Sequence, residues 1–324
     1  MGSPLPPARR FPISMMVCVL ALAACTRAPG VAAADDSASA DTSALIAVAS
    51  PDSTAVSSSE LATHVDVDVV PLRAPPDAEI PAGPLGASIR RGRALLETTR
   101  DSLPTNVGNR LRCLSCHLDG GRRADASPLV GAFLHYPAYN SRSGRIYTIE
   151  DRINDCFRRS MAGRPLAAES ADLRDMVAYL AFLSRGIPLG ANVAGTGLPK
   201  MKPLAPDPTR GRDIFASTCT RCHGANGDGT ALAPPLWGPG SYSIGAGMAR
   251  LRTAASFIRH NMPYDRPGTL TDQQAFDVAS YINSHPRPDL AGKENDWPHG
   301  DQPPDVAYPT RASKSGGGAP PRTR

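Results

Sequence analysis

Large aromatic side chains are scarce in this sequence: Phe, Trp and Tyr make up 5% of its 324 residues, and only two are Trp. Two conventional cores would be thinly supplied with rings, which leaves room for a bound cofactor to fill them. A long basic run is also lacking and the formal net charge is only +5, which argues against a nucleic-acid partner. The length suits two modest domains, and the 33 prolines and 29 glycines indicate much loop or linker.

The apolar stretch ISMMVCVLALAAC, residues 13–25, is too short to cross a bilayer as a mature helix. Two arginines precede it, which is the pattern of an export signal. The stretch ends in LAAC, which resembles the bacterial lipobox, so we expect Cys25 to be acylated and to begin the mature chain. Thr26 then favours a periplasm-facing protein held in the outer membrane by its lipid alone. Cleavage after Ala34 is the alternative and gives a soluble periplasmic protein.

Two short segments, CLSCH (113–117) and CTRCH (219–223), carry the attachment pattern of c-type haem. In this pattern two thioethers join the porphyrin, and the adjacent histidine lies under the iron. No further Cys-x-x-Cys pair is present to complete zinc sites. The sequence therefore predicts two covalently bound haem c groups, with attachment through Cys113, Cys116, Cys219 and Cys222 and iron ligation by His117 and His223.

Of the seven cysteines, Cys156 is the one left without a role after the signal, the anchor and the haem thiols are assigned. It lies 39 residues after His117, and Met262 lies 39 residues after His223. We therefore predict Cys156 and Met262 as the distal iron ligands, with Met248 as a competitor of Met262. Thioether ligation raises the haem potential and thiolate ligation lowers it, so the second haem should be the electron exit.

The two haem segments belong to an internal repeat. In each half an amphipathic helix precedes the haem motif, and a further helix follows the distal ligand (SADLRDMVAYLAFLSR and TDQQAFDVASYINSH). This is the order of a class I cytochrome c, so the fold class is all-α, with two such domains in tandem. We expect a lipoprotein signal peptide (1–24) and then a flexible tether (25–84), which has local order at HVDVDVVPL. The catalytic His/Cys haem domain (85–188), a linker (189–206) and the electron-transfer His/Met haem domain (207–297) follow. A disordered tail (298–324) ends the chain.

Cys156 lies in an arginine-rich segment: residues 141–165 hold six arginines and three acids. Thr148 and Asp151 have the spacing of a helix N-terminal cap, and a helix from there places Arg152 and Ser160 one turn to either side of Cys156. Guanidinium groups suit oxyanions and would lower the pKa of the thiol. The plain alternative is a solvated arginine-rich surface that pairs with haem propionates.

The segments RCLSCHLDGGR, SRSGRIYTIEDRINDCFRRS and PPLWGPGSYSIGAGMARLRTAASFIRHNMP resemble, in this order, the thiosulfate dehydrogenase family of dihaem cytochromes. The resemblance implies reversible coupling of two thiosulfates to tetrathionate, with His/Cys ligation at the catalytic haem. We also expect a periplasmic or membrane electron acceptor, such as a cytochrome c, as a partner. The active-site residues that it implies are Arg142, Arg152, Cys156 and Ser160.

One position departs from the family. Some members carry a lysine directly before the distal methionine and exchange ligands on reduction, whereas this chain has Asn261. We therefore expect plain His223/Met262 ligation. A non-enzymatic dihaem electron carrier remains the alternative function, although it would need neither Cys156 nor its arginines. A dihaem peroxidase would need an open iron site, and a subunit of a sulfur-oxidising carrier complex would need a partner protein bearing the substrate.

Overall fold

The computed structural model describes residues 69–314. The predicted signal peptide, Cys25 and most of the predicted tether lie outside this range. Within residues 69–314, no helix combines the length and apolarity needed to cross a bilayer.

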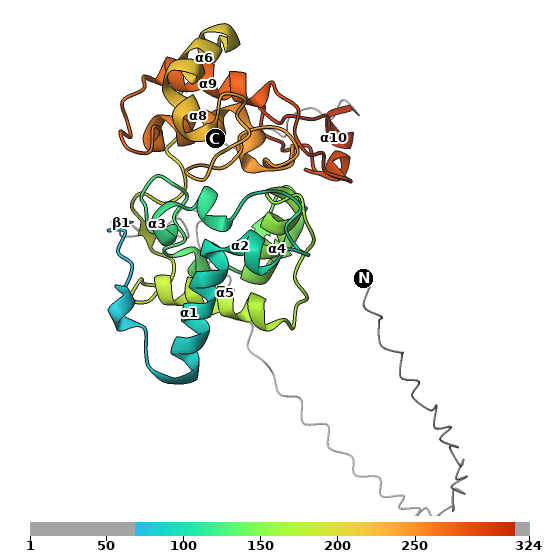
Figure 1. Ribbon diagram of the computed structural model, residues 1–324. Helices are drawn as coiled ribbons and strands as arrows, with labels where there is room; N and C mark the ends of the chain where they lie inside the picture. The colour runs from blue at the N-terminus through green and yellow to red at the C-terminus, as the bar shows by residue number, and fades with distance from the viewer. Residues whose placement is uncertain (1–68, 315–324) are drawn as a thin grey trace, which may run out of the picture. The chain divides into compact units, whose positions relative to one another are not determined.

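The described chain is mostly helical, with two small pairs of strands (Figure 1). The longer helices of the first half are α1 (Gly83–Glu97), α4 (Ile149–Arg159) and α5 (Ala171–Leu183), and those of the second are α6 (Pro208–Ile214), α8 (Leu251–Asn261) and α9 (Asp272–Asn283). Single turns are α2 (Thr99–Ser102), α3 (Leu118–Gly121), α7 (Thr220–His223) and α10 (Arg311–Lys314). The strand pairs are parallel β1 (Val69–Val70) with β4 (Asn192–Val193), and antiparallel β2 (Ala138–Asn140) with β3 (Arg145–Tyr147).

The first half forms a core between α1 and α5, which lie side by side (Figure 1). Gly92 of α1 lies at the crossing: a Cβ there would come within 1.9 Å of the Asp175 carbonyl oxygen. Only glycine therefore permits this approach of the two backbones. The neighbouring Arg91 secures the crossing, since its Nε donates to the Asp175 carboxylate at 2.7 Å.

The second half repeats this arrangement with α6 and α9. A Cβ on Gly211 of α6 would lie 2.0 Å from the Asp277 carbonyl oxygen, and Arg210 Nε donates to the Asp277 carboxylate at 2.9 Å. The repeat read from the sequence thus extends to the contacts at each helix crossing. The chain therefore forms two helical domains of the same design. Each domain has its own hydrophobic cluster.

The helix cap predicted at Thr148 and Asp151 is present as a capping box at the start of α4. Thr271 and Gln274 form another at the start of α9. The apolar face of α9, formed by Phe276, Val278, Ala279 and Ile282, is buried in the second core.

Part of the predicted tether is ordered against the first domain. Besides the pairing of β1 with β4, Asp77 forms an ion pair with Arg122 at 2.7 Å and another with Arg93. These contacts extend the ordered chain upstream of residue 85, the predicted start of the domain.

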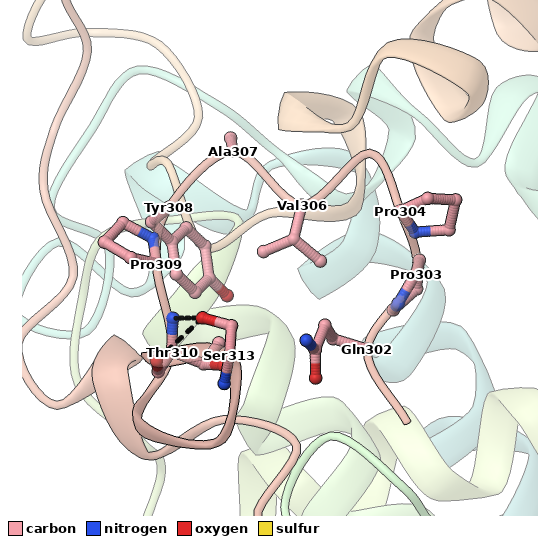
Figure 2. Close-up of a pocket in the computed structure, with 9 residues that line it drawn as sticks. All are labelled: Gln302, Pro303, Pro304, Val306, Ala307, Tyr308, Pro309, Thr310 and Ser313. Atoms are coloured by element: carbon pink, nitrogen blue, oxygen red, sulfur yellow. Dashed lines mark hydrogen bonds between the residues drawn. The ribbon is translucent and has the colours of Figure 1, made fainter. Parts of the chain in front are cut away.

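The predicted disordered tail is wrong for residues 298–314. We name residues 286–314 the C-terminal strap. Its Tyr308 and Thr310 are buried, and Tyr308 donates a hydrogen bond to Asp296 at 2.6 Å. Figure 2 shows the loop from Gln302 to Thr310, which Ser313 closes by accepting from the Thr310 amide at 2.9 Å. Pro, Gly and Ser suggested disorder from composition, but the buried side chains and specific contacts fix this segment.

Candidate active site

The first haem-attachment segment presents two thiols and an oriented imidazole. Cys113 and Cys116 flank the short turn before His117. The Nδ1–H of His117 donates to the Ser127 carbonyl oxygen at 2.6 Å, which leaves Nε2 with its lone pair for a metal.

Cys156 faces this histidine from α4. The helix begins at the Thr148 cap and continues for a turn beyond Cys156 before it ends at Arg159. Arg152, one turn earlier, donates from Nη1 to the Cys156 Sγ at 2.9 Å. Burial raises the pKa of the Cys156 thiol, but the Arg152 charge and the adjacent His117 outweigh it and lower this pKa to about 7. At neutral pH a substantial fraction of Cys156 is therefore present as the thiolate.

A cavity of about 950 Å³ opens beside Cys156. All four residues implied by the family resemblance line it: Arg142, Arg152, Cys156 and Ser160. The second domain, its preceding linker and the C-terminal strap also contribute to the lining, through Lys200, Arg250 and Trp297 among others.

Among residues 69–314, Arg142 has no carboxylate partner. Its Nη1 donates to the Gly245 carbonyl oxygen at 2.9 Å, and its guanidinium lies over the Trp297 ring, 4.9 Å from the centroid. Burial lowers the pKa of Arg142, and the charges of Arg159 and Arg250 lower it further. A side chain this basic remains charged, so a bound anion would stabilise this part of the cavity.

Arg159 anchors the end of α4 to the strap. It pairs with Asp155 one turn earlier, at 2.9 Å, and forms a two-pronged ion pair with Asp296, at 2.6 and 2.7 Å. Nearby, Asn109 donates to the carbonyl oxygens of Ser160 and Ser241, at 2.8 and 3.0 Å. The helix that carries Cys156 is thus fixed by contacts from both domains and the strap.

The second haem-attachment segment has the same proximal design. The Nδ1–H of His223 donates to the Pro234 carbonyl oxygen at 2.8 Å. Met262 and Met248 both pack against the second core, as does Cys219. The packing keeps both candidates open, and the spacing argument favours Met262.

The equal spacing of Cys156 and Met262 does not give them equal local structure. Cys156 lies inside α4, whereas Met262 follows the last residue of α8 in an extended conformation. The reason is Pro263, because a residue before proline is pushed out of the helical region. Asn261, in the place of the family's lysine, is buried and donates to the Asp125 carbonyl oxygen at 2.8 Å. It therefore joins the two domains.

These donor sets fit c-type haem. Each domain supplies two thiols and one imidazole whose Nδ1–H is held by a backbone carbonyl, the arrangement that directs Nε2 to iron. In the first domain a thiol also faces the imidazole.

Sequence reasoning missed several residues of this site. Asp296 and Trp297 fall at the end of the predicted second domain, and no short-range pattern links them to α4. Arg250 lies in a segment used for the family resemblance, yet its place in the cavity depends on how the second domain packs against the first. Excess arginine was the available signal, but it does not show which arginines share a cavity.

Comparison with known proteins identifies the two domains. Residues 105–189 match the family model described as SoxA/TsdA, cytochrome c domain, and residues 206–282 match cytochrome C oxidase, cbb3-type, subunit III. The two matches confirm the predicted fold class, two cytochrome c domains in tandem.

Thiosulfate dehydrogenase from Psychrobacter arcticus is 45% identical over 242 residues, which cover 72% of this chain and 74% of the relative. Thiosulfate dehydrogenase from Allochromatium vinosum is 47% identical over 230 residues, 68% of this chain and 85% of the relative. The solved thiosulfate dehydrogenase (TsdBA) from Marichromatium purpuratum is 38% identical with a TM-score of 0.67, and the match covers 72% of this chain and 54% of that chain. This chain thus spans about half of that solved protein. By the extent and identity of the curated matches, the chain belongs to the thiosulfate dehydrogenase family of c-type cytochromes.

Proposed function

We propose that this protein oxidises two thiosulfate ions to tetrathionate in the cavity beside Cys156, and that it can run the reverse reaction. The observation that carries the proposal is the Arg152–Cys156 contact of 2.9 Å at the wall of an arginine-lined cavity. The names of the related proteins supply the substrate, thiosulfate.

Charge is the main obstacle to this reaction. Two dianions whose centres lie about 6 Å apart repel each other by on the order of 10 kcal/mol at an effective dielectric constant near 20. The guanidinium groups of Arg142 and Arg152 offset this repulsion, and they are already fixed in place, so they need little reorganisation.

Cys156 divides the reaction into two steps. In the first, the Cys156 thiolate and one thiosulfate form a sulfur–sulfur bond, giving a cysteine S-thiosulfonate and releasing two electrons. In the second, another thiosulfate attacks this adduct, so that tetrathionate leaves and the thiolate returns. No proton is taken up or released in either step. Two haem c groups, held by Cys113, Cys116, Cys219 and Cys222 with His117 and His223, would take one electron each and pass them to an external acceptor such as a cytochrome c.

Assays of the purified protein in both directions test this function. One uses thiosulfate with an electron acceptor, and the other uses tetrathionate with a reductant. Thiosulfate-dependent acceptor reduction with tetrathionate as the product is the expected result. Rapid electron exchange without any turnover of thiosulfate would identify the protein as an electron carrier.

Met262 is proposed as the distal ligand of the second haem. Met262→Gly should remove the weak far-red band of methionine-ligated ferric haem and lower the potential of this haem by about 0.1 V or more, within the roughly 0.8 V range that axial ligands control. Spectroelectrochemistry measures both effects. Met248→Leu is the matched control, and loss of the band in that variant instead would assign the ligand to Met248.

Cys25 is proposed as a lipid anchor that holds the protein on the periplasmic side of the outer membrane. Wild-type protein should partition into detergent with the membrane fraction, and Cys25→Ala should abolish lipoprotein processing. Intact-mass analysis of the natively exported protein checks this. A mature chain that begins at Asp35 would instead establish a soluble periplasmic protein.

A further inference from the structure

Arg250 has no assigned role, although it lines the cavity that holds Cys156. It is the N-cap residue of α8 in the second domain. Its Nε is buried and has no hydrogen-bond partner, and its guanidinium makes no ion pair with any residue of the described range 69–314. An unpaired buried donor on a charged group is costly, so a bound group that accepts from it would be strongly favoured.

The charges around Arg250 point to an anionic occupant. Three other arginines of the cavity are compensated by partners: Arg159 by Asp155 and Asp296, Arg252 by Asp305, and Arg152 by the Cys156 sulfur. Arg142 and Arg250 have no such partner among the described residues, and the charge of Arg250 contributes to the lowered pKa of Arg142. Two guanidinium groups that line one cavity without a carboxylate partner among residues 69–314 favour an oxyanion there.

We propose that Arg250, together with Arg142, forms a second anion subsite that binds the sulfonate group of the attacking thiosulfate. The inference rests on the proposed function, because the second step brings a dianion to a cavity where the first thiosulfate is already bonded to Cys156. Arg152, which contacts the Cys156 sulfur, binds the first thiosulfate. Arg250, in the second domain, binds the second thiosulfate. The two domains then share one active site, since the first supplies the nucleophile and the second supplies part of the site for its attacker.

The second step can be measured apart from electron transfer. Tetrathionate converts the Cys156 thiolate of the oxidised holoprotein to the S-thiosulfonate and releases one thiosulfate. After excess tetrathionate is removed, added thiosulfate discharges the adduct, re-forming tetrathionate and the thiolate. Intact-mass spectrometry follows the adduct, and the thiosulfate concentration that gives half-maximal discharge reports occupancy of the second subsite.

Arg250→Gln should raise the thiosulfate concentration for half-maximal discharge at least about tenfold, as expected for the loss of a charge-assisted hydrogen bond. Arg250→Lys should raise it less, because lysine keeps the charge. Arg212→Gln removes the same charge from an exposed position of the second domain and should behave as wild type. The potentials and absorption spectra of both haems in substrate-free protein should be the same in all variants.

Arg250 could instead bind a haem propionate. The variants distinguish binding of a propionate from binding of thiosulfate. A shifted potential of the first haem in substrate-free Arg250→Gln, with unchanged discharge, would assign the arginine to the propionate and overturn the inference. Unchanged discharge and unchanged potentials would also overturn it. A wild type that neither forms the adduct nor turns over thiosulfate would overturn the proposed function itself.

Discussion

Replacing Cys156 by methionine should reduce thiosulfate oxidation by at least about a thousandfold, to background, because a thioether cannot form the S-thiosulfonate bond. The first haem should nevertheless remain low-spin and six-coordinate, since methionine also ligates iron. Its potential should rise, because a neutral thioether replaces an anionic thiolate. Steady-state assays and spectroelectrochemistry of the same preparation measure the two effects separately.

Arg152→Ala is the matched variant for this experiment. It removes the side chain that donates to the Cys156 sulfur at 2.9 Å but keeps the sulfur itself. The thiolate spectrum should persist, while thiosulfate binding should weaken by roughly 1.5–3 kcal/mol, the value of a hydrogen bond to a charged group. Substantial tetrathionate formation by Cys156→Met would instead mean that the cysteine only tunes the iron, and the covalent mechanism would then be wrong.

The haem sites can be read from the sequence because their pattern is local. Cys-x-x-Cys-His places two thiols and an imidazole within one turn, and the helix caps at Thr148 and Thr271 have fixed spacings. The order of helices then identifies two cytochrome c domains. Arg152 could be placed beside Cys156 in the same way, because residues four apart on a helix are neighbours.

The rest of the site depends on contacts between distant parts of the chain. Arg142 contacts Gly245, more than a hundred residues later, and Arg159 pairs with Asp296. No periodic pattern encodes these distances. The strap was misjudged for the same reason, since its composition is that of a disordered tail and its order comes from a few buried side chains, above all Tyr308.

The strap leads to a second prediction with a large effect. Asp296→Asn should lower the free energy of unfolding by about 3 kcal/mol, because breaking a buried ion pair leaves its partner's charge uncompensated. The side chains of Arg159 and Asp296 are only 11% and 7% exposed. Asp155 still pairs with Arg159, which places the expected loss at the lower end of the range for such pairs. Urea unfolding of the holoprotein, followed by circular dichroism, measures it.

Two control variants on the strap test whether burial causes the effect. Asp289→Asn makes the same chemical change in an exposed ion pair with Lys293, where Asp289 is 71% exposed, and should cost less than about 1 kcal/mol. Tyr308→Phe removes the hydroxyl that donates to the Asp296 carboxylate and should cost about 1.5 kcal/mol. Equal losses in Asp289→Asn and Asp296→Asn would show that the strap does not anchor α4. The predicted order, with Asp296→Asn much the largest, would mean that the helix carrying Cys156 draws its stability from a segment about 140 residues away.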